Sequence, residues 1–369
     1  MPKNASHINH LAQLYNSNGM YDKAFETYQK SLEVDPDNPN THLAFANYYL
    51  RKGERDKYIE ELHIAFGNPD LKIERKIEVL ASDFNLFSPV IDSINEAYDL
   101  CEVLISVHSS NARGYVVYGD FLKKGKRYED ALNQYKNAVK LDNSKMAYWD
   151  QVLFIEIDLE KYDSLVIHAD QALEVFPTQL RIYYVKSSAL LQLKNYEEVI
   201  NAAEEGLEYY SDEIDLLSGM HANLGEAHYQ LKNYPLSDTA YLKALEYDPN
   251  STYVLNNYSY YLSLRNDKLD EASEMSKKAN DIEPNNAAFQ DTYGWILYMM
   301  SEFEEAKIWI EKSISNGGTN SGVIIEHYGD ILYQLGDVEQ AVINWKKARE
   351  LGLDSDLIDK KISDMKLYE

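Results

Sequence analysis

A short sequence pattern recurs along this 369-residue chain at an almost constant spacing. Segment 24–36 reads AFETYQKSLEVDP, segment 131–142 reads ALNQYKNAVKLD, and segment 341–351 reads AVINWKKAREL. Aligning these segments with weaker copies gives one recurring position, whose successive gaps are 34, 73, 34, 34, 38, 35, 34 and 35 residues. The residues at this position are Ala24, Tyr58, Ala131, Leu165, Val199, Ser237, Ala272, Ala306 and Ala341. A period of 34 residues predicts a solenoid of helix-turn-helix units.

Each predicted unit contains two apolar stripes at helical spacing, separated by a short polar turn. In the unit 218–251, the first stripe includes Leu224 and His228, which share one face of a helix. The second stripe includes Tyr241 and ends before Pro249, because proline cannot continue a helix. This alternation predicts an all-α chain.

Small residues recur where the two helices of a unit are expected to cross. They are Ala12, Ala46, Gly119, Gly225, Gly294 and Gly329. Glycine inside a helix costs about 1 kcal/mol relative to alanine, so close packing of the two backbones is the expected compensation.

The pattern divides the chain into ten units and a closing helix. The predicted units are 5–38, 39–70, 71–111, 112–145, 146–179, 180–217, 218–251, 252–286, 287–321 and 322–353. A helix over about 355–367 follows, with one apolar face to cover the last unit. We group these into N-terminal units (1–70), an atypical helical pair (71–111), a main array (112–353) and a C-terminal capping helix (354–369).

Segment 71–111 departs from the repeat, because it lacks the alanine-aromatic-alanine helix of the other units. Pro89 would separate a helix over 71–84 from one over 90–107. We predict a helical pair here and expect it to divide an N-terminal lobe from a longer C-terminal one. Cys101 is the only cysteine, which excludes an intrachain disulfide and favours a buried apolar side chain over a reactive thiol.

The recurring residues resemble the tetratricopeptide repeat (TPR) family. Matches to its first-helix pattern are Leu224-Gly225, Tyr293-Gly294 and Tyr328-Gly329, and matches to its second-helix pattern include Ala131, Tyr135 and Ala138. The resemblance implies a right-handed TPR superhelix (α-solenoid) that binds polypeptides and carries no chemistry. Segment 256–330 also looks like multi-repeat TPR proteins of Gram-negative bacteria such as Bacteroidota, whose relatives often carry an export or lipoprotein leader.

The chain is strongly acidic, with 36 Lys and Arg against 61 Asp and Glu and a net charge of -25. Such a surface repels phosphate backbones and anionic lipid, so we expect no nucleic-acid partner and no direct membrane insertion. No run approaches the length of a membrane-spanning helix, and the first residues show no signal region. As written, the sequence predicts a soluble, cytoplasmic protein, or a periplasmic or lipid-anchored one if a leader has been trimmed.

No arrangement of residues typical of an active site is found. His221 and His228 lie seven residues apart, whereas a metal pair on a helix requires i,i+4 spacing with a third ligand nearby. We interpret both as packing residues. Phosphate-binding glycine loops and a nucleophile elbow are absent from the sequence. We therefore predict a protein that is not an enzyme, with no catalytic residue, metal or cofactor.

The concave groove of the later units is the candidate binding site, because first helices line this groove in the TPR family. The predicted groove residues are Asn223, Glu226, Tyr229, Asn256, Asn257, Tyr260, Asp291, Trp295, Tyr298, Glu326, Asp330 and Tyr333. Amides can satisfy the backbone of an extended peptide, aromatic rings supply contact area, and carboxylates prefer Lys or Arg. The alternative is that these residues are exposed or pack between repeats.

The chaperone-tail-binding branch of the TPR family uses a clamp of Lys, Asn and Arg on three consecutive first helices. The corresponding positions here hold Asn223 and Glu226, Asn257 and Tyr260, and Thr292 and Trp295. These residues disfavour an acidic tail. We expect a protein or an extended peptide as partner, and the carboxylates favour a basic one.

Two functions remain open from the sequence. The leading prediction is a non-catalytic protein–protein interaction scaffold or adaptor that binds its partner in the concave groove. The alternative is a structural organiser of a cell-envelope or secretion assembly, which would also use the acidic convex face. The oligomeric state is left open.

Overall fold

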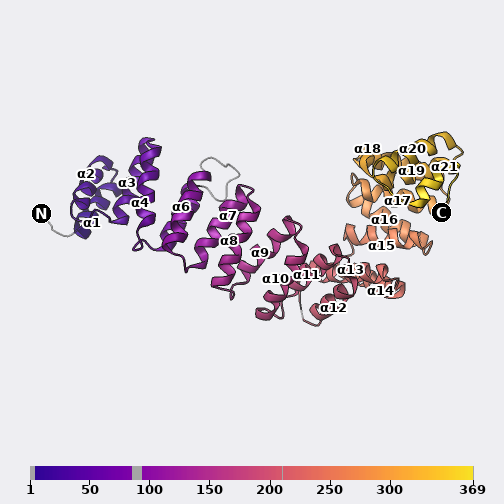
Figure 1. Ribbon diagram of the computed structural model, residues 1–369, viewed down its shortest axis with the longest axis horizontal. Coiled ribbons are helices and arrows are strands. Elements are labelled where there is room, and N and C mark those ends of the chain that lie inside the picture. The colour runs from indigo at the N-terminus through magenta and orange to yellow at the C-terminus, as the bar shows by residue number, and fades with distance from the viewer. Residues whose placement is uncertain (1–4, 85–93, 210, 369) are drawn as a thin grey trace. The chain divides into compact units, whose positions relative to one another are not determined.

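The computed structural model describes residues 5–84, 94–209 and 211–368, and within these ranges it contains helices and no strand (Figure 1). The predicted all-α array of helix pairs is confirmed. The chain divides into two compact units, residues 1–177 and 178–369. This division falls inside the predicted main array 112–353, and the four predicted domain ranges stay a prediction.

The first compact unit is a series of helices joined mostly by short turns (Figure 1). Its helices are α1 (Ala5–Ser17), α2 (Tyr21–Leu32), α3 (Pro39–Lys52), α4 (Arg55–Gly67), α5 (Ile73–Asp83), α6 (Ile94–Val107), α7 (Ala112–Lys124), α8 (Tyr128–Leu141), α9 (Met146–Asp158) and α10 (Tyr162–Val175). The odd-numbered helix of each pair is its first helix and the even-numbered one its second.

The second compact unit continues the same alternation and ends with the single helix α21 (Figure 1). Its elements are α11 (Leu180–Gln192), α12 (Tyr196–Leu207), α13 (Ile214–Gln230), α14 (Tyr234–Tyr247), α15 (Thr252–Leu264), α16 (Leu269–Ile282), α17 (Ala287–Met299), α18 (Phe303–Ser315), the 3-10 turn η1 (Gly318–Asn320), α19 (Gly322–Gln334), α20 (Val338–Glu350) and α21 (Asp356–Asp364).

Most turns inside a pair share one backbone geometry. Three residues connect the helices, and the middle one is left-handed, with φ between 54° and 88°. The middle residues are Gly19, Lys126, Glu160, Lys194, Lys232, Ser301 and Gly336. The next backbone N–H bonds the carbonyl five residues earlier, as Arg127 does to Leu122 at 2.9 Å. This is a helix-ending Schellman arrangement, and it fixes the angle at which the second helix returns.

The core of several pairs is an aromatic ring of the second helix packed on a glycine of the first. A Cβ added at Gly225 would lie 2.8 Å from the Tyr241 ring, and one added at Gly329 would lie 2.6 Å from the Trp345 ring. Tyr241 and Trp345 are fully buried. Glycine at these two crossings therefore makes room for a ring of the second helix, rather than only for its backbone as the sequence had led us to expect.

Three boundaries differ from the sequence prediction or lie outside the description. Helix α13 begins at Ile214, four residues before the start of the predicted unit 218–251; the four extra residues of the 38-residue gap form one more helical turn. Helix α21 ends at Asp364 rather than near 367, because Met365 is left-handed (φ 48°). Pro89 lies outside the described residues.

The atypical segment forms helices α5 and α6 within its described residues, 71–84 and 94–111. Helix α6 packs mainly against α4 and α7 rather than against α5. Cys101 lies on α6 and is fully buried, as predicted, and burial raises the pKa of its thiol.

Candidate partner-binding surface

The twelve predicted groove residues lie on α13, α15, α17 and α19, the first helices of four consecutive pairs in residues 178–369. Helix α17 packs against both α15 and α19. We call the surface that these four helices form the first-helix surface. The structure uses the residues of this surface in different ways.

Asn223 links α13 to the preceding first helix. Its side chain is buried, and its amide nitrogen lies 2.9 Å from the Ser187 hydroxyl and 3.0 Å from the Ser188 hydroxyl. A buried amide with these partners stabilises the contact between consecutive pairs. Asn223 therefore packs between repeats, as in the alternative interpretation of the sequence.

Glu226 is an acceptor for tyrosines of two consecutive pairs. It accepts from the Tyr241 hydroxyl at 3.1 Å within its own pair and from the Tyr261 hydroxyl of α15 at 2.6 Å. The Tyr229 ring stacks on the Tyr261 ring with 3.8 Å between centroids. Sequence reasoning missed Tyr261, although it lies beside the predicted Tyr260.

On α15, the two predicted asparagines contact each other. The Asn256 amide donates to the Asn257 side-chain oxygen at 3.1 Å, while the buried Asn256 Oδ1 has no hydrogen-bond partner among the described residues. Tyr260 is half-buried, and burial with nearby Asp291 raises its pKa to about 12. Asn257 and Tyr260 are the half-exposed polar groups in the middle of the first-helix surface.

A ring stack connects α17 with α19. Trp295 lies 4.1 Å from the His327 ring and 4.7 Å from the Tyr298 ring, both nearly parallel to it. His327 Nδ1 lies 2.9 Å from Asp291 Oδ1. Burial alone would lower the pKa of His327, but Asp291 and the two carboxylates near it outweigh burial and raise the pKa. Sequence reasoning missed His327, whose partner lies one repeat earlier.

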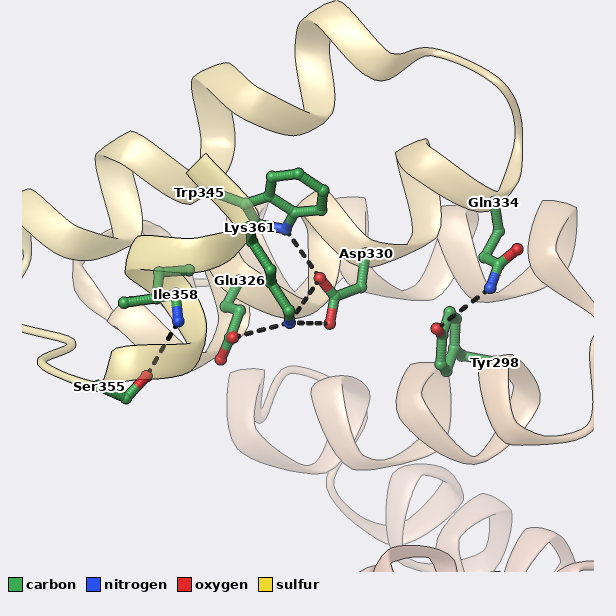
Figure 2. A network of polar contacts seen from close by, with 8 residues as sticks. All are labelled: Tyr298, Glu326, Asp330, Gln334, Trp345, Ser355, Ile358 and Lys361. Atoms are coloured by element: carbon green, nitrogen blue, oxygen red, sulfur yellow. Dashed lines mark hydrogen bonds and ion pairs between the residues drawn. The ribbon is translucent and has the colours of Figure 1, made fainter. Parts of the chain in front are cut away.

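Glu326 and Asp330, the acidic pair, hold a lysine from the C-terminal helix (Figure 2). Lys361 Nζ of α21 lies 2.9 Å from Glu326 Oε1 and 2.8 Å from Asp330 Oδ2. The Trp345 indole N–H donates to Asp330 Oδ1 at 2.7 Å. Lys361 and Asp330 are each only 3% exposed. Burial raises the pKa of Asp330, while the Lys361 ammonium opposes that rise.

A cavity of about 300 Å³ opens beside Lys361. It is lined by Leu264, Trp295, Tyr298, Met299, Glu326, His327, Asp330, Leu357, Lys361 and Tyr368. Its volume is at the small end of the range for ligand pockets. Four predicted residues therefore meet at one cavity, and α21 with the residues after it supplies another wall.

The remaining predicted residues do not line this cavity. Tyr333 is half-buried with its ring 5.7 Å from that of Trp345, and Asn223, Glu226 and Tyr229 belong to the pair built on α13. No sequence signal within one repeat pointed to Lys361, because its partners lie 31 and 35 residues away.

Among the described residues, no group of three or more His, Cys, Asp or Glu side chains is placed to hold a metal ion. His221 stacks on the Tyr247 ring at 5.5 Å, and burial lowers its pKa. In the ranges that the structure covers, no helix has both the length and the apolar character needed to cross a membrane.

Stacked helix pairs with this turn and this glycine-ring core define an α-solenoid repeat protein. Models of the TPR repeat match residues 12–53, and models of the tetratricopeptide repeat match residues 112–145, 180–213 and 218–251. These four segments carry the repeats of the tetratricopeptide repeat family, as the sequence pattern indicated. Proteins of this family are typically non-catalytic scaffolds.

Known proteins support the fold. A tetratricopeptide repeat protein from Parabacteroides merdae superposes with a TM-score of 0.54 at 17% identity, over 70% of this chain and 99% of that one. The APC/C hetero-tetramer Cut9-Hcn1 gives 0.57 at 12% identity, over 98% and 76%. The Hsp70-Hsp90 organizing protein of Triticum aestivum is 22% identical over 64% of this chain and 40% of its own length. The chain spans less than half the length of the curated relatives it matches.

Proposed function

We propose that this chain is a non-catalytic protein–protein interaction scaffold that binds a protein or extended peptide on the first-helix surface of residues 178–369. The observation that carries the proposal is the convergence of Trp295, Tyr298 and the acidic pair on one cavity at the end of that surface. Aromatic rings beside satisfied and half-exposed polar groups are typical of surfaces that bind polypeptides. The similarity to an Hsp70-Hsp90 organizing protein also supports a role in bringing proteins together.

The charge of the surface favours a basic partner. Glu226, Asp291 and the acidic pair contribute carboxylates from three first helices. Among the described residues that line the cavity, Lys361 is the one lysine or arginine, and two carboxylates already neutralise it. A lysine or arginine of a partner would meet a potential of opposite sign here, which steers association and fixes orientation.

The test uses half-exposed residues, because alanine at the buried Tyr298 or the stacked Trp295 would also disturb the core. A double variant, Asn257→Ala with Tyr260→Ser, changes the middle of the first-helix surface. Ile308→Ser is the matched control, since Ile308 is 63% exposed on the second helix α18. Each tagged chain is used to capture proteins from the native host, and circular dichroism verifies folding.

We expect the double variant to lose at least one partner that the wild-type chain and the Ile308→Ser chain both retain. Recovery of the same partners in the same amounts by all three chains would contradict a binding role for this surface.

A further inference from the structure

We propose that α21 is an internal ligand: Lys361 occupies in cis a site that also accepts the lysine of an amphipathic partner helix, and the two compete. The proposal deepens the proposed function and rests on it for the role of the first-helix surface. The partner would be a helix with an apolar residue followed three positions later by lysine. Helix α21 would regulate access to the site, because it competes with that partner helix.

The first argument is the position of α21 in a series of contacts between consecutive first helices. Helices α13, α15, α19 and α21 each place a donor on an acceptor of the preceding first helix, at separations of 31 to 36 residues. The donor–acceptor pairs are Asn223 with Ser187, Tyr261 with Glu226, His327 with Asp291, and Lys361 with Asp330. Helix α21 therefore makes the contact of a first helix, although no second helix follows it among the described residues.

The second argument is that α21 has few buried anchors. It is nine residues long, and its fully buried side chains are Ile358 and Lys361. Leu357 is exposed, as is Met365 just beyond the helix. A helix this short is marginal in water on its own, so its place depends on these two anchors and on Ile362, which is partly buried against the same core. A partner helix that presents the same two groups can replace it.

The third argument is that the acidic pair requires a cation. The Asp330 carboxylate is buried between Trp345 Nε1 and Lys361 Nζ (Figure 2). A buried carboxylate that loses its cation is strongly destabilised, so a site vacated by Lys361 would favour another ammonium group over water. The ammonium group binds three carboxylate oxygens there, which makes the site selective for lysine.

The fourth argument is access. The 300 Å³ cavity lies beside Lys361 and is lined by Trp295 and Tyr298 of α17 and by Leu357 and Tyr368 from α21 and the residues after it. Glu326 keeps 17% of its side chain exposed and contacts Lys361 from this side. An incoming lysine can therefore contact Glu326 before Lys361 leaves Asp330, which gives a stepwise route for exchange.

The experiment supplies α21 in trans. The probe is a fluorescein-labelled peptide with the sequence of residues 354–367, and binding to the full chain is measured by fluorescence anisotropy. Two variants of the chain open the site independently: Lys361→Ala removes the internal ammonium, and Ile358→Ser removes the apolar anchor while the lysine remains. Lys360→Ala is the matched control, because Lys360 is the exposed neighbour on the same helix.

We expect both opened chains to bind the peptide at least about 10-fold more tightly than the wild-type chain and the Lys360→Ala chain. A peptide carrying Lys361→Met should bind the opened chains at least about 10-fold more weakly, whereas a peptide carrying Lys360→Met should bind like the original. Adding Asp330→Asn to the Ile358→Ser chain should abolish binding.

Equal binding to opened and wild-type chains, or equal binding of the two substituted peptides, would overturn the proposal. Circular dichroism of each chain shows whether the array is still folded, and the two opened variants do not share a route to misfolding. Because the probe is part of this chain, the result does not depend on any host partner. Failure of the capture experiment with success here would count against the proposed function and leave the lysine site standing.

Discussion

Each compact unit contains a buried lysine, and the two lysines are satisfied in opposite ways. In residues 1–177, Lys76 of α5 is fully buried and donates to two backbone carbonyls, Phe66 O at 2.7 Å and Asn68 O at 3.0 Å. In residues 178–369, Lys361 of α21 binds two carboxylates. Burial lowers the pKa of Lys76 to about 8, since no carboxylate is bonded to it.

The difference shows how the same helical repeat can use one residue type for two purposes. Lys76 closes the end of α4 by satisfying carbonyls that the helix leaves open, and His108 Nε2 lies 2.8 Å from its amine. The carbonyls at the Lys76 site require a hydrogen-bond donor, which can be charged or neutral. Lys361 neutralises a buried acid, and that site needs a cation. The first contact is structural, whereas the second can be exchanged for another cation.

The largest effect on stability is expected from replacing Trp345, whose indole donates to Asp330 of the acidic pair. Trp345→Ala should lower the free energy of unfolding by about 4 kcal/mol, because it empties a fully buried indole and removes a donor to Asp330. Urea unfolding followed by circular dichroism measures this change. Leu236→Ala, at a side chain 54% exposed, is the control and should change stability by less than about 0.5 kcal/mol. A loss below about 2 kcal/mol for Trp345→Ala would mean that the ring is not a core residue.

The second-largest effect on stability is expected from removing the Lys361 ammonium group. Lys361→Met should cost about 3 kcal/mol, because the Asp330 carboxylate is then left buried without its counterion. The half-exposed ion pair of Arg55 with Glu96 in the first unit provides a contrast, and Arg55→Met should cost at most about 1 kcal/mol. Equal costs for the two variants would contradict the view that burial makes the Lys361 contact different.

A smaller effect is expected at the other buried lysine. Lys76→Met should lower the free energy of unfolding by about 2 kcal/mol, since it leaves two carbonyl oxygens without a donor but leaves no buried charge unpaired. The measurement is again urea unfolding, with the transition of the first unit followed by hydrogen exchange at α4 and α5. A cost above that of Lys361→Met would reverse the comparison between the two lysines.

The last effect is a change of stability with pH. The pKa of Lys76 is lowered to about 8 in the folded chain and returns to its ordinary, higher value on unfolding. The unfolded state therefore binds more protons above pH 8, so this lysine makes stability rise as pH increases from about 8 to 10. Lys76→Met should remove that rise, seen by comparing unfolding curves of both chains at pH 8 and pH 10. An unchanged pH dependence would show that Lys76 titrates normally.

The fold was predictable because the recurring residues are those that pack the two helices of a pair against each other. The recurring position marks the second helix, and the glycines at 225 and 329 mark where rings cross the first helix. The contact recurs at the same separation, 16 residues, for Gly119 with Tyr135, Gly225 with Tyr241 and Gly329 with Trp345, so spacing reveals it. The extra turn of α13 escaped prediction because it changes length without changing the pattern.

The site was predictable only in part, because its key contacts join different repeats. The predicted Asp291 and Asp330 are correctly placed on first helices, but their partners His327 and Lys361 come from the next first helix and from α21. Periodicity shows which face a residue occupies. It does not show which side chain of the following copy extends back to it, since that depends on rotamers and on local burial.

The repeated left-handed turn offers a route to engineering. Five of its seven middle positions carry a side chain: Lys126, Glu160, Lys194, Lys232 and Ser301. A side chain in this conformation costs roughly 1 kcal/mol that glycine would not. Glycine substitutions at these positions would give a series of variants with stepwise higher stability and unchanged binding surfaces. A weak complex could then be studied on scaffolds of increasing stability.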